Sequence, residues 1–299
     1  MCTAIAFNKS GLFFGRTLDA EGGFGERIVT APRLSPLHFS SGEVISEHYA
    51  LLGMGLLHES FPLLFDGFNE RGLCGAALNF EGFARYENAI GRKNEIASYE
   101  LLCRILALCK SVSEAKNLLS GRVITDKKAG EGIEPTPLHW IFADREAVIT
   151  VEQTESGLSV YENLAGVLAN SPDFPFHEKR LSEISHLSDK NPEGEFFSLG
   201  YGGLGLPGDY SSQSRFIKAS FIRRYAECEN AFDFFRAIET VAIPRGAVVN
   251  DRGEAHHTVY TSCIEADSLT YLYHAYPSRS IITARLVDPS VTSTTVTYL

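Results

Sequence analysis

The residue best suited to chemistry stands directly behind the first methionine. Cys2 opens the segment MCTAIAFN, and its thiol becomes a strong nucleophile when it loses its proton. Methionine aminopeptidase removes a leading methionine when a residue as small as cysteine follows, so we expect Cys2 to become N-terminal. A free α-amine has a pKa of about 7.7–8.0 and can exchange a proton with the thiol of the same residue at neutral pH. The competing interpretation is a small apolar residue that is simply buried.

The sequence after Cys2 predicts a hairpin that shapes the surroundings of the thiol. Residues 3–8 and 12–16 have the pattern of strands around a short glycine-containing turn. In the register that this turn sets, Cys2 lies opposite Leu18, and both share a face of the hairpin with Arg16. A slip of one residue would separate them.

In this register, two charged residues of the hairpin are candidates to act on the thiol and the α-amine of Cys2. A guanidinium favours a thiolate beside it, so Arg16 is a candidate partner of the Cys2 sulfur. Asp19, at the end of the strand, is a candidate to orient the α-amine. The competing interpretation is an ordinary surface ion pair.

The remaining elements come in blocks. Strands are expected at 50–54, 64–69, 73–78, 139–143, 147–153, 158–162, 167–169, 258–264, 270–276 and 281–286. Helices are expected after an N-cap at Ser98, over SVSEAKNLL, and near 176–184, 214–225 and 230–241. Strands at both ends with helices in blocks indicate one α+β domain with layered sheets. The loops at 127–137 and 189–196 are long enough to be functional.

Composition excludes several classes of protein. A net charge of -10 and a pI of about 5.4 argue against a general nucleic-acid binder. No apolar run reaches the length of a membrane span and no signal peptide is evident, so we expect a cytoplasmic protein. The six cysteines are dispersed without a CxxC pair, and His256-His257 lacks a ligand spacing, so neither a metal nor another cofactor is expected. GYGGLG at 200–205 is followed by Pro-Gly-Asp where a nucleotide-binding helix would begin.

Five separated segments carry a family resemblance. They are MCTAIAF with FGRTLD, NERGLCGAALNFEGF, TPLHWIFAD, GVLANSPDFPFH and GLGLPGDYSSQSRF, in this order. Together they resemble the choloylglycine hydrolase family, which includes bile salt hydrolases and penicillin V acylases. The resemblance implies the fold of the N-terminal nucleophile hydrolases, a four-layer αββα sandwich, with residues 2–299 as one domain after loss of Met1. It also implies a homo-oligomer, as relatives are commonly homotetramers.

The resemblance assigns roles to six polar residues. Cys2 is the nucleophile that attacks an amide carbonyl, and Arg16 and Asp19 hold its thiolate and α-amine. Asn79 matches an oxyanion-hole position through its side-chain amide. The remaining two match a polar position near the N-terminus and the arginine that completes the charged network; these are Asn170 and Arg215. Taken singly, residues such as Asn79, Asn170 and Arg215 are more often structural, bonding a turn or lying on a helix face.

The resemblance also suggests a substrate. Leu18, Phe24, Ile133 and Leu138, all on or beside loops, match pocket positions, although each could equally be local core. The favoured reaction is hydrolysis of glycine- or taurine-conjugated bile acids, small-molecule amides. The alternatives are a penicillin V acylase, an acylase of N-acyl amino acids or acyl-homoserine lactones, and a bile acid binding protein without turnover. Asn79 favours bile salts, because penicillin V acylases often carry Tyr there, whereas Ala20 and His58 depart from the bile salt pattern.

Overall fold

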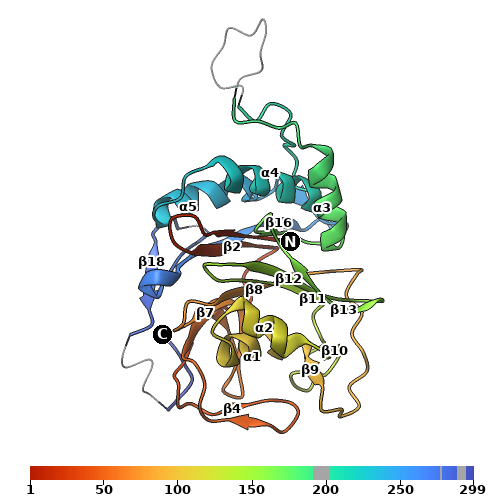
Figure 1. Ribbon diagram of the computed structural model, residues 1–299, viewed down its shortest axis with the longest axis vertical. Coiled ribbons are helices and arrows are strands. Elements are labelled where there is room, and N and C mark those ends of the chain that lie inside the picture. Colours follow the sequence, from red (N-terminus) through yellow and green to blue (C-terminus); the bar gives the residue numbers. More distant parts are fainter. Residues whose placement is uncertain (191–201, 277, 288–293) are drawn as a thin grey trace, which may run out of the picture.

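Two large antiparallel sheets lie face to face, and helices cover their outer faces (Figure 1). The computed structural model describes residues 1–190, 202–276, 278–287 and 294–299. Part of the loop expected at 189–196 and the start of GYGGLG lie outside the described residues; the rest of GYGGLG forms a turn, and the next helix begins only at Ser212.

The first sheet contains the hairpin that carries Cys2. Its strand order is β14-β1-β2-β16-β17-β18, and β15 pairs with β16. The bounds are β1 Cys2–Phe7, β2 Phe13–Ala20, β14 Val167–Leu168, β15 Val248–Val249, β16 Ala255–Glu265, β17 Thr270–Ala275 and β18 Ile282–Arg285. β1 and β2 are buried along their whole length, because the second sheet covers one face and helices cover the other.

The second sheet packs against the first. Its strand order is β13-β12-β11-β8-β7-β6-β3-β19. The bounds are β3 Arg27–Ala31, β6 Leu51–His58, β7 Phe61–Asn69, β8 Cys74–Asn79, β11 Leu138–Ala143, β12 Val148–Thr154, β13 Gly157–Glu162 and β19 Thr297–Tyr298. Two small pairs lie outside the large sheets, β4 Leu37–His38 with β5 Val44–Ile45 and β9 Glu95–Ala97 with β10 Val123–Thr125.

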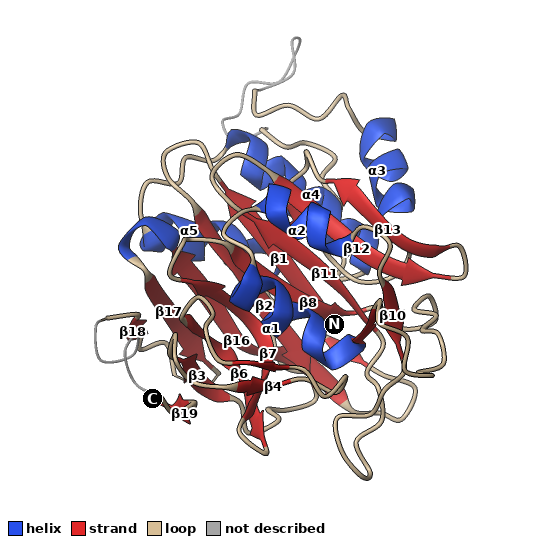
Figure 2. Cartoon of the chain, turned by 60° about the horizontal axis from the view of Figure 1, so that its bottom comes forward, coloured by secondary structure: helices blue, strands red, loops and turns tan. Residues whose placement is uncertain are grey.

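The helices form the two outer layers. α1 Leu101–Leu108 and α2 Val112–Leu119 lie across the strands of the second sheet (Figure 2). α3 Phe174–Glu183, α4 Ser212–Tyr225 and α5 Ala231–Ile238 lie on the side of the first sheet (Figure 1). Asn230 caps α5 by accepting the backbone N–H groups of Phe232 and Asp233, and Ser211 caps α4 in the same way through Ser214. The predicted αββα sandwich is therefore confirmed.

The alternation of strand residues explains the layering. In β11, Ile141 and Ala143 pack into the core between the sheets, whereas Trp140 and Phe142 point to the core beneath α1 and α2. A strand with apolar residues on both faces must be covered on both faces. No helix in the described part of the chain is long and apolar enough to span a membrane.

Three local expectations were wrong. β2 runs to Ala20 and not to residue 16, because Thr17 and Leu18 still pair with β1 and the strand continues to Ala20 along β16, which is distant in sequence. Ser98 begins a 3-10 turn, Ser98–Glu100, and makes no capping bond; Glu100 occupies the N-cap of α1. The helix expected at 230–241 ends at Ile238 and continues as a 3-10 turn, Glu239–Val241. Strands β3 and β19 were not predicted at all.

Candidate active site

The hairpin register places Arg16 on the sulfur of Cys2. Cys2 pairs with Leu18 and Ala4 pairs with Arg16, the register expected from the turn. Nη2 of Arg16 donates a hydrogen bond to Sγ of Cys2, and both residues are buried. A guanidinium in direct contact with a thiol favours the thiolate, which is the nucleophilic form.

The guanidinium of Arg16 is fixed by the second sheet. Its Nη1 donates to the carbonyl oxygens of Phe65 at 3.1 Å and Ala77 at 2.7 Å. Burial alone would lower the pKa of Arg16, but nearby anionic groups, Cys2 first among them, raise it above its ordinary value. The arginine therefore stays charged beside the thiol.

A buried carboxylate that the sequence gave no reason to select lies close to Arg16. Asp66 on β7 accepts hydrogen bonds from the hydroxyls of Tyr260 and Tyr271, each at 2.5 Å, and it is fully buried. Burial raises the pKa of Asp66, and the charge of Arg16 together with the hydrogen bonds opposes this rise. A sequence search for charged partners of Arg16 misses Asp66, because their proximity arises from the packing of one sheet on the other.

Asp19 is held by hydroxyl groups. Its carboxylate accepts from Thr258 at 2.6 Å and from Thr17 at 3.1 Å. Its backbone bonds Met1, accepting the terminal amine at 2.5 Å and donating to the Met1 carbonyl at 2.8 Å. With Met1 in place, the nitrogen of Cys2 bonds Asn170 and not Asp19.

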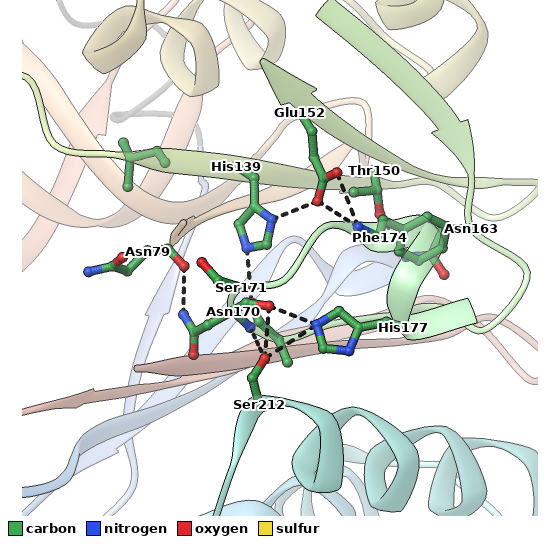
Figure 3. Close-up of polar contacts among 12 residues, drawn as sticks. Asn79, His139, Thr150, Glu152, Asn163, Asn170, Ser171, Phe174, His177 and Ser212 are labelled. Carbon is green, nitrogen blue, oxygen red and sulfur yellow. Dashed lines mark hydrogen bonds and ion pairs between the residues drawn. The ribbon is translucent and has the colours of Figure 1, made fainter. Parts of the chain in front are cut away.

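Asn170 connects the nucleophile to two other predicted residues, of which Figure 3 shows Asn79. Its Oδ1 accepts from the backbone nitrogen of Cys2 at 2.7 Å and from Nη2 of Arg215 at 2.7 Å. Its Nδ2 donates to the backbone carbonyl of Asn79 at 2.8 Å. Because both ends of the amide are engaged, its orientation is fixed relative to Cys2.

Arg215 approaches Cys2 from α4. Its Nη1 donates to the backbone oxygen of Cys2 at 2.5 Å and to Oγ1 of Thr3 at 2.6 Å. Burial lowers the pKa of Arg215, and the charges of Asp19 and Cys2 oppose this effect. Two arginines therefore flank Cys2, Arg16 at its sulfur and Arg215 at its backbone.

Asn79 stands at the end of β8, on the wall of a cavity that also exposes Cys2. Its Oδ1 accepts the backbone N–H of Glu81 at 2.8 Å. With the oxygen engaged, Nδ2 is the group that the side chain has left to donate to a ligand.

The cavity has a volume of ≈ 430 Å³ and lies between the two sheets. All four predicted pocket residues line it; they are Leu18, Phe24, Ile133 and Leu138. Cys2, Arg16, Asp19 and Asn79 also line it, so polar groups stand beside the thiol. The expectation that Leu18 lies on or beside a loop was wrong, because it stands within β2.

The wall includes residues that sequence reasoning missed or doubted. The loop at 127–137, expected to be functional, supplies Ala129, Ile133 and Glu134. A pair formed by Glu21 and His256, 2.7 Å apart, also lines the cavity. Ala20 lines it as well, whereas His58 is not among its lining residues.

The histidines and cysteines elsewhere have structural surroundings. His139 is a buried, hydrogen-bonded histidine, as expected, with Glu152 and the carbonyl of Ala169 as partners. The six cysteines are free and buried. In the described residues, no group of three or more His, Cys, Asp or Glu side chains is arranged to hold a metal ion.

A buried cysteine whose thiol contacts an arginine and whose backbone nitrogen bonds an asparagine, beside an apolar cavity, fits the site of a cysteine amidohydrolase. A family model described as linear amide C–N hydrolases, choloylglycine hydrolase family, matches residues 2–297. The chain belongs to the choloylglycine hydrolase family, and the resemblance seen in the sequence is confirmed. It is an enzyme of the linear amide C–N hydrolase class, and Cys2 fits an N-terminal nucleophile.

Relatives and solved structures agree with this assignment. The chain is 35% identical to a bile salt hydrolase/transferase of Lactiplantibacillus plantarum, with 94% of this chain and 91% of the relative covered. It is 33% identical to a conjugated bile acid hydrolase of Lactobacillus acidophilus, with both chains fully covered. The crystal structure of the C2A mutant of the conjugated bile acid hydrolase from Clostridium perfringens superposes with a TM-score of 0.92 at 31% identity, covering 100% of this chain and 96% of the other. Penicillin V acylase from Agrobacterium tumefaciens shares the fold, with a TM-score of 0.79 at 18% identity over 99% of this chain and 90% of the other.

Proposed function

We propose that this enzyme hydrolyses the amide bond of glycine- or taurine-conjugated bile acids, with Cys2 as the N-terminal nucleophile. The observation that carries the proposal is the contact between Sγ of Cys2 and Arg16 at the polar end of a largely apolar cavity. Relatives named as bile acid hydrolases at 33–35% identity over nearly the whole chain support the choice of substrate.

Removal of Met1 prepares the nucleophile. Met1 itself lines the cavity beside Cys2, and its backbone occupies the N–H and C=O of Asp19. Its loss opens this part of the cavity and converts the Cys2 peptide nitrogen into a free amine. Oδ1 of Asn170 accepts one N–H of that amine, which turns its lone pair toward a defined side.

The reaction then follows thiol acyl transfer. The amine takes the thiol proton, and the sulfur forms a bond to the amide carbonyl carbon. The C–N bond breaks as the amine returns the proton to glycine or taurine, which leaves a thioester on Cys2. Water, deprotonated by the same amine, attacks the thioester, releases the bile acid and restores the thiol.

The oxyanion formed in each step needs hydrogen-bond donors. Nδ2 of Asn79 is a candidate donor, because its partner oxygen is already engaged and the side chain lines the cavity. One such donor contributes about 3–4 kcal/mol to the stability of a transition state of this type.

The cavity walls suit the acyl group. A steroid is rigid and apolar, and contact with Leu18, Ile133 and Leu138 removes its surface from water at about 25 cal/mol per Å². Phe24, which is 59% exposed, packs edge-on against Phe65 and is available to cover a bound ligand.

The test is the release of product from a panel of amides. Purified enzyme is incubated separately with glycocholate, taurocholate, penicillin V and a long-chain N-acyl amino acid or acyl-homoserine lactone, and products are quantified by mass spectrometry. The proposal expects cholate with glycine or taurine. Cleavage of penicillin V or of the long-chain amides alone would assign the enzyme to the other acylases, and binding of bile acid without turnover would overturn catalysis.

We also propose an assembly state, from the resemblance, and a cellular location, from the sequence pattern. We expect a homotetramer, which light scattering after gel filtration measures against the chain mass of 32.9 kDa. We also expect a cytoplasmic location, which cell fractionation tests.

A further inference from the structure

The backbone carbonyls of two consecutive residues, Ala169 and Asn170, each lie within hydrogen-bond distance of a buried histidine (Figure 3). Nε2 of His139 lies 3.0 Å from the carbonyl oxygen of Ala169, and Nε2 of His177 lies 2.8 Å from that of Asn170. Both imidazoles are fully buried, on β11 and α3 respectively. Since a carbonyl only accepts, each of these nitrogens carries its hydrogen and donates.

Nε2 of His177 lies close to two oxygens, the carbonyl of Asn170 at 2.8 Å and Oγ of Ser212 at 3.3 Å. Burial lowers its pKa to about 4, so the ring is neutral at neutral pH and has one N–H group. Its Nδ1 is buried without a hydrogen-bond partner in the described part of the chain. The ring stacks on Phe216, with centroids 4.8 Å apart. The single N–H donor of His177 therefore serves Asn170 first, because the carbonyl of Asn170 is the nearer of the two oxygens.

Ser212 holds the same peptide from α4. Its Oγ accepts the backbone N–H of Asn170 at 2.9 Å and donates to the carbonyl of Asn170 at 2.8 Å. Arg215, one turn further along α4, bonds Oδ1 of Asn170. The start of α4 therefore fixes both the backbone and the side chain of Asn170.

His139 is itself anchored on its second nitrogen. Nδ1 lies 3.0 Å from Oε1 of Glu152, which is fully buried and also accepts the backbone N–H of Phe174 at 3.1 Å. The ring stacks on Phe80 with centroids 4.3 Å apart. The pair joins β11 and β12 to the start of α3 and to the segment before Asn170.

We propose that His139, His177 and Ser212 are positioning residues that hold Asn170 in register with the amine of Cys2. The proposal rests on the proposed function, in which Asn170 directs that amine toward the thiol. None of the three is among the residues that line the cavity. Loss of their hydrogen bonds therefore slows proton transfer within Cys2 and leaves binding of the acyl group intact.

The test compares a shape-conserving variant with a donor-conserving one. His177→Phe keeps the ring against Phe216 but removes the donor to Asn170, whereas His177→Gln restores an N–H donor. We expect His177→Phe to lower kcat for glycocholate by about 10- to 100-fold, with KM within about 2-fold of wild type. The rate of Cys2 alkylation by iodoacetamide, followed by peptide mass, falls in parallel, and His177→Gln recovers most of both rates.

A matched control separates positioning from stability. His48 is also buried and bonded to two backbone carbonyls, of Ser35 and Tyr49, but lies outside the site. His48→Phe is expected to lower the melting temperature without changing kcat. If His177→Phe does not fold, Ser212→Ala supplies the same measurement.

The outcomes distinguish the two proposals. Wild-type kcat and alkylation rate in His177→Phe, or a loss that His177→Gln does not recover, would overturn the positioning role. A wild type that cleaves no bile acid would overturn only the proposed function, because the alkylation rates of Cys2 would still decide whether His177 positions the amine.

Discussion

At the scale of single residues, the site depends on charges that are buried together. Arg16 contacts the sulfur of Cys2. The charge of Asp66 acts to raise the pKa of Arg16, and the charge of Arg16 acts to lower the pKa of Asp66. The two oxygens of Asp66 take one tyrosine hydroxyl each, Tyr260 on Oδ2 and Tyr271 on Oδ1. A group with two accepting oxygens is required there, since both hydroxyls donate.

Asp66→Asn tests this requirement. The amide has one accepting oxygen, so one tyrosine hydroxyl meets an NH₂ group, and Arg16 loses a buried countercharge. We expect the free energy of unfolding to fall by about 3–5 kcal/mol. Urea denaturation followed by fluorescence measures it.

The control for this change is an exposed ion pair. Asp267 pairs with Arg145 at the surface, where both side chains are largely exposed. Asp267→Asn is expected to change the unfolding free energy by less than about 1 kcal/mol. Equal effects of the two substitutions would contradict the role given to Asp66.

At the scale of elements, the position of Arg16 depends on how β2 packs against β16. Gly15 precedes Arg16, and a Cβ built at Gly15 would lie 2.0 Å from the carbonyl oxygen of Ser262 on β16. The two strands approach closely because residue 15 has no side chain, which brings the backbone N–H of Arg16 to Oγ of Ser262 at 3.2 Å.

Gly15→Ala tests this packing. The added methyl group forces β2 away from β16, which we expect to destabilise the fold by about 1–3 kcal/mol and to shift Arg16 relative to Cys2, so that kcat falls. Gly22→Ala is the matched control, because its Cβ would meet nothing within 4 Å. Unchanged stability and kcat in Gly15→Ala would show that the strands separate without consequence for the site.

Features that depend on residues close together in the sequence could be predicted, whereas features that depend on residues far apart in the sequence could not. The hairpin register and the helix over SVSEAKNLL, which is α2, depend on a few neighbouring residues, and short turns and periodicity identify them. The last two residues of β2, Asp19 and Ala20, pair only with β16, more than 200 residues away. Asp66 near Arg16 and His177 on Asn170 likewise arise from packing between layers, which no local pattern encodes.

At the scale of the whole molecule, one core joins the two sheets and the helices that cover the first sheet. The apolar cluster that includes Ile5, Phe14 and Phe216 also contains Phe68 and Ile141 of the second sheet. We therefore propose that residues 2–299 form one domain that unfolds in a single cooperative transition. Two separated transitions in calorimetry would contradict this.

The buried His177 makes that transition sensitive to acid. Its pKa falls from 6.5 to about 4 on folding, mainly through burial and, less strongly, through the charges of His139 and Arg215; the Asn170 carbonyl and Asp173 oppose the shift. A depressed histidine pKa stabilises the fold fully above pH 6.5, and this contribution is lost as the pH falls from 6.5 to about 4.

The pH dependence is measured by urea denaturation of wild type and His177→Gln at pH 7 and pH 4.5. We expect the wild type to lose more stability than the variant over this interval, because glutamine does not titrate. Equal losses in both proteins would show that His177 does not contribute.

The central claim is that Cys2, once N-terminal, carries the hydrolysis. The most direct measurement is release of cholate from glycocholate by wild type and by Cys2→Ala, with the intact mass of each protein before and after iodoacetamide. The account predicts a wild type without Met1, one alkyl group on Cys2 with loss of activity, and no cholate from the variant. An active wild type that retains Met1, or a Cys2→Ala variant that releases cholate at the wild-type rate, would contradict it.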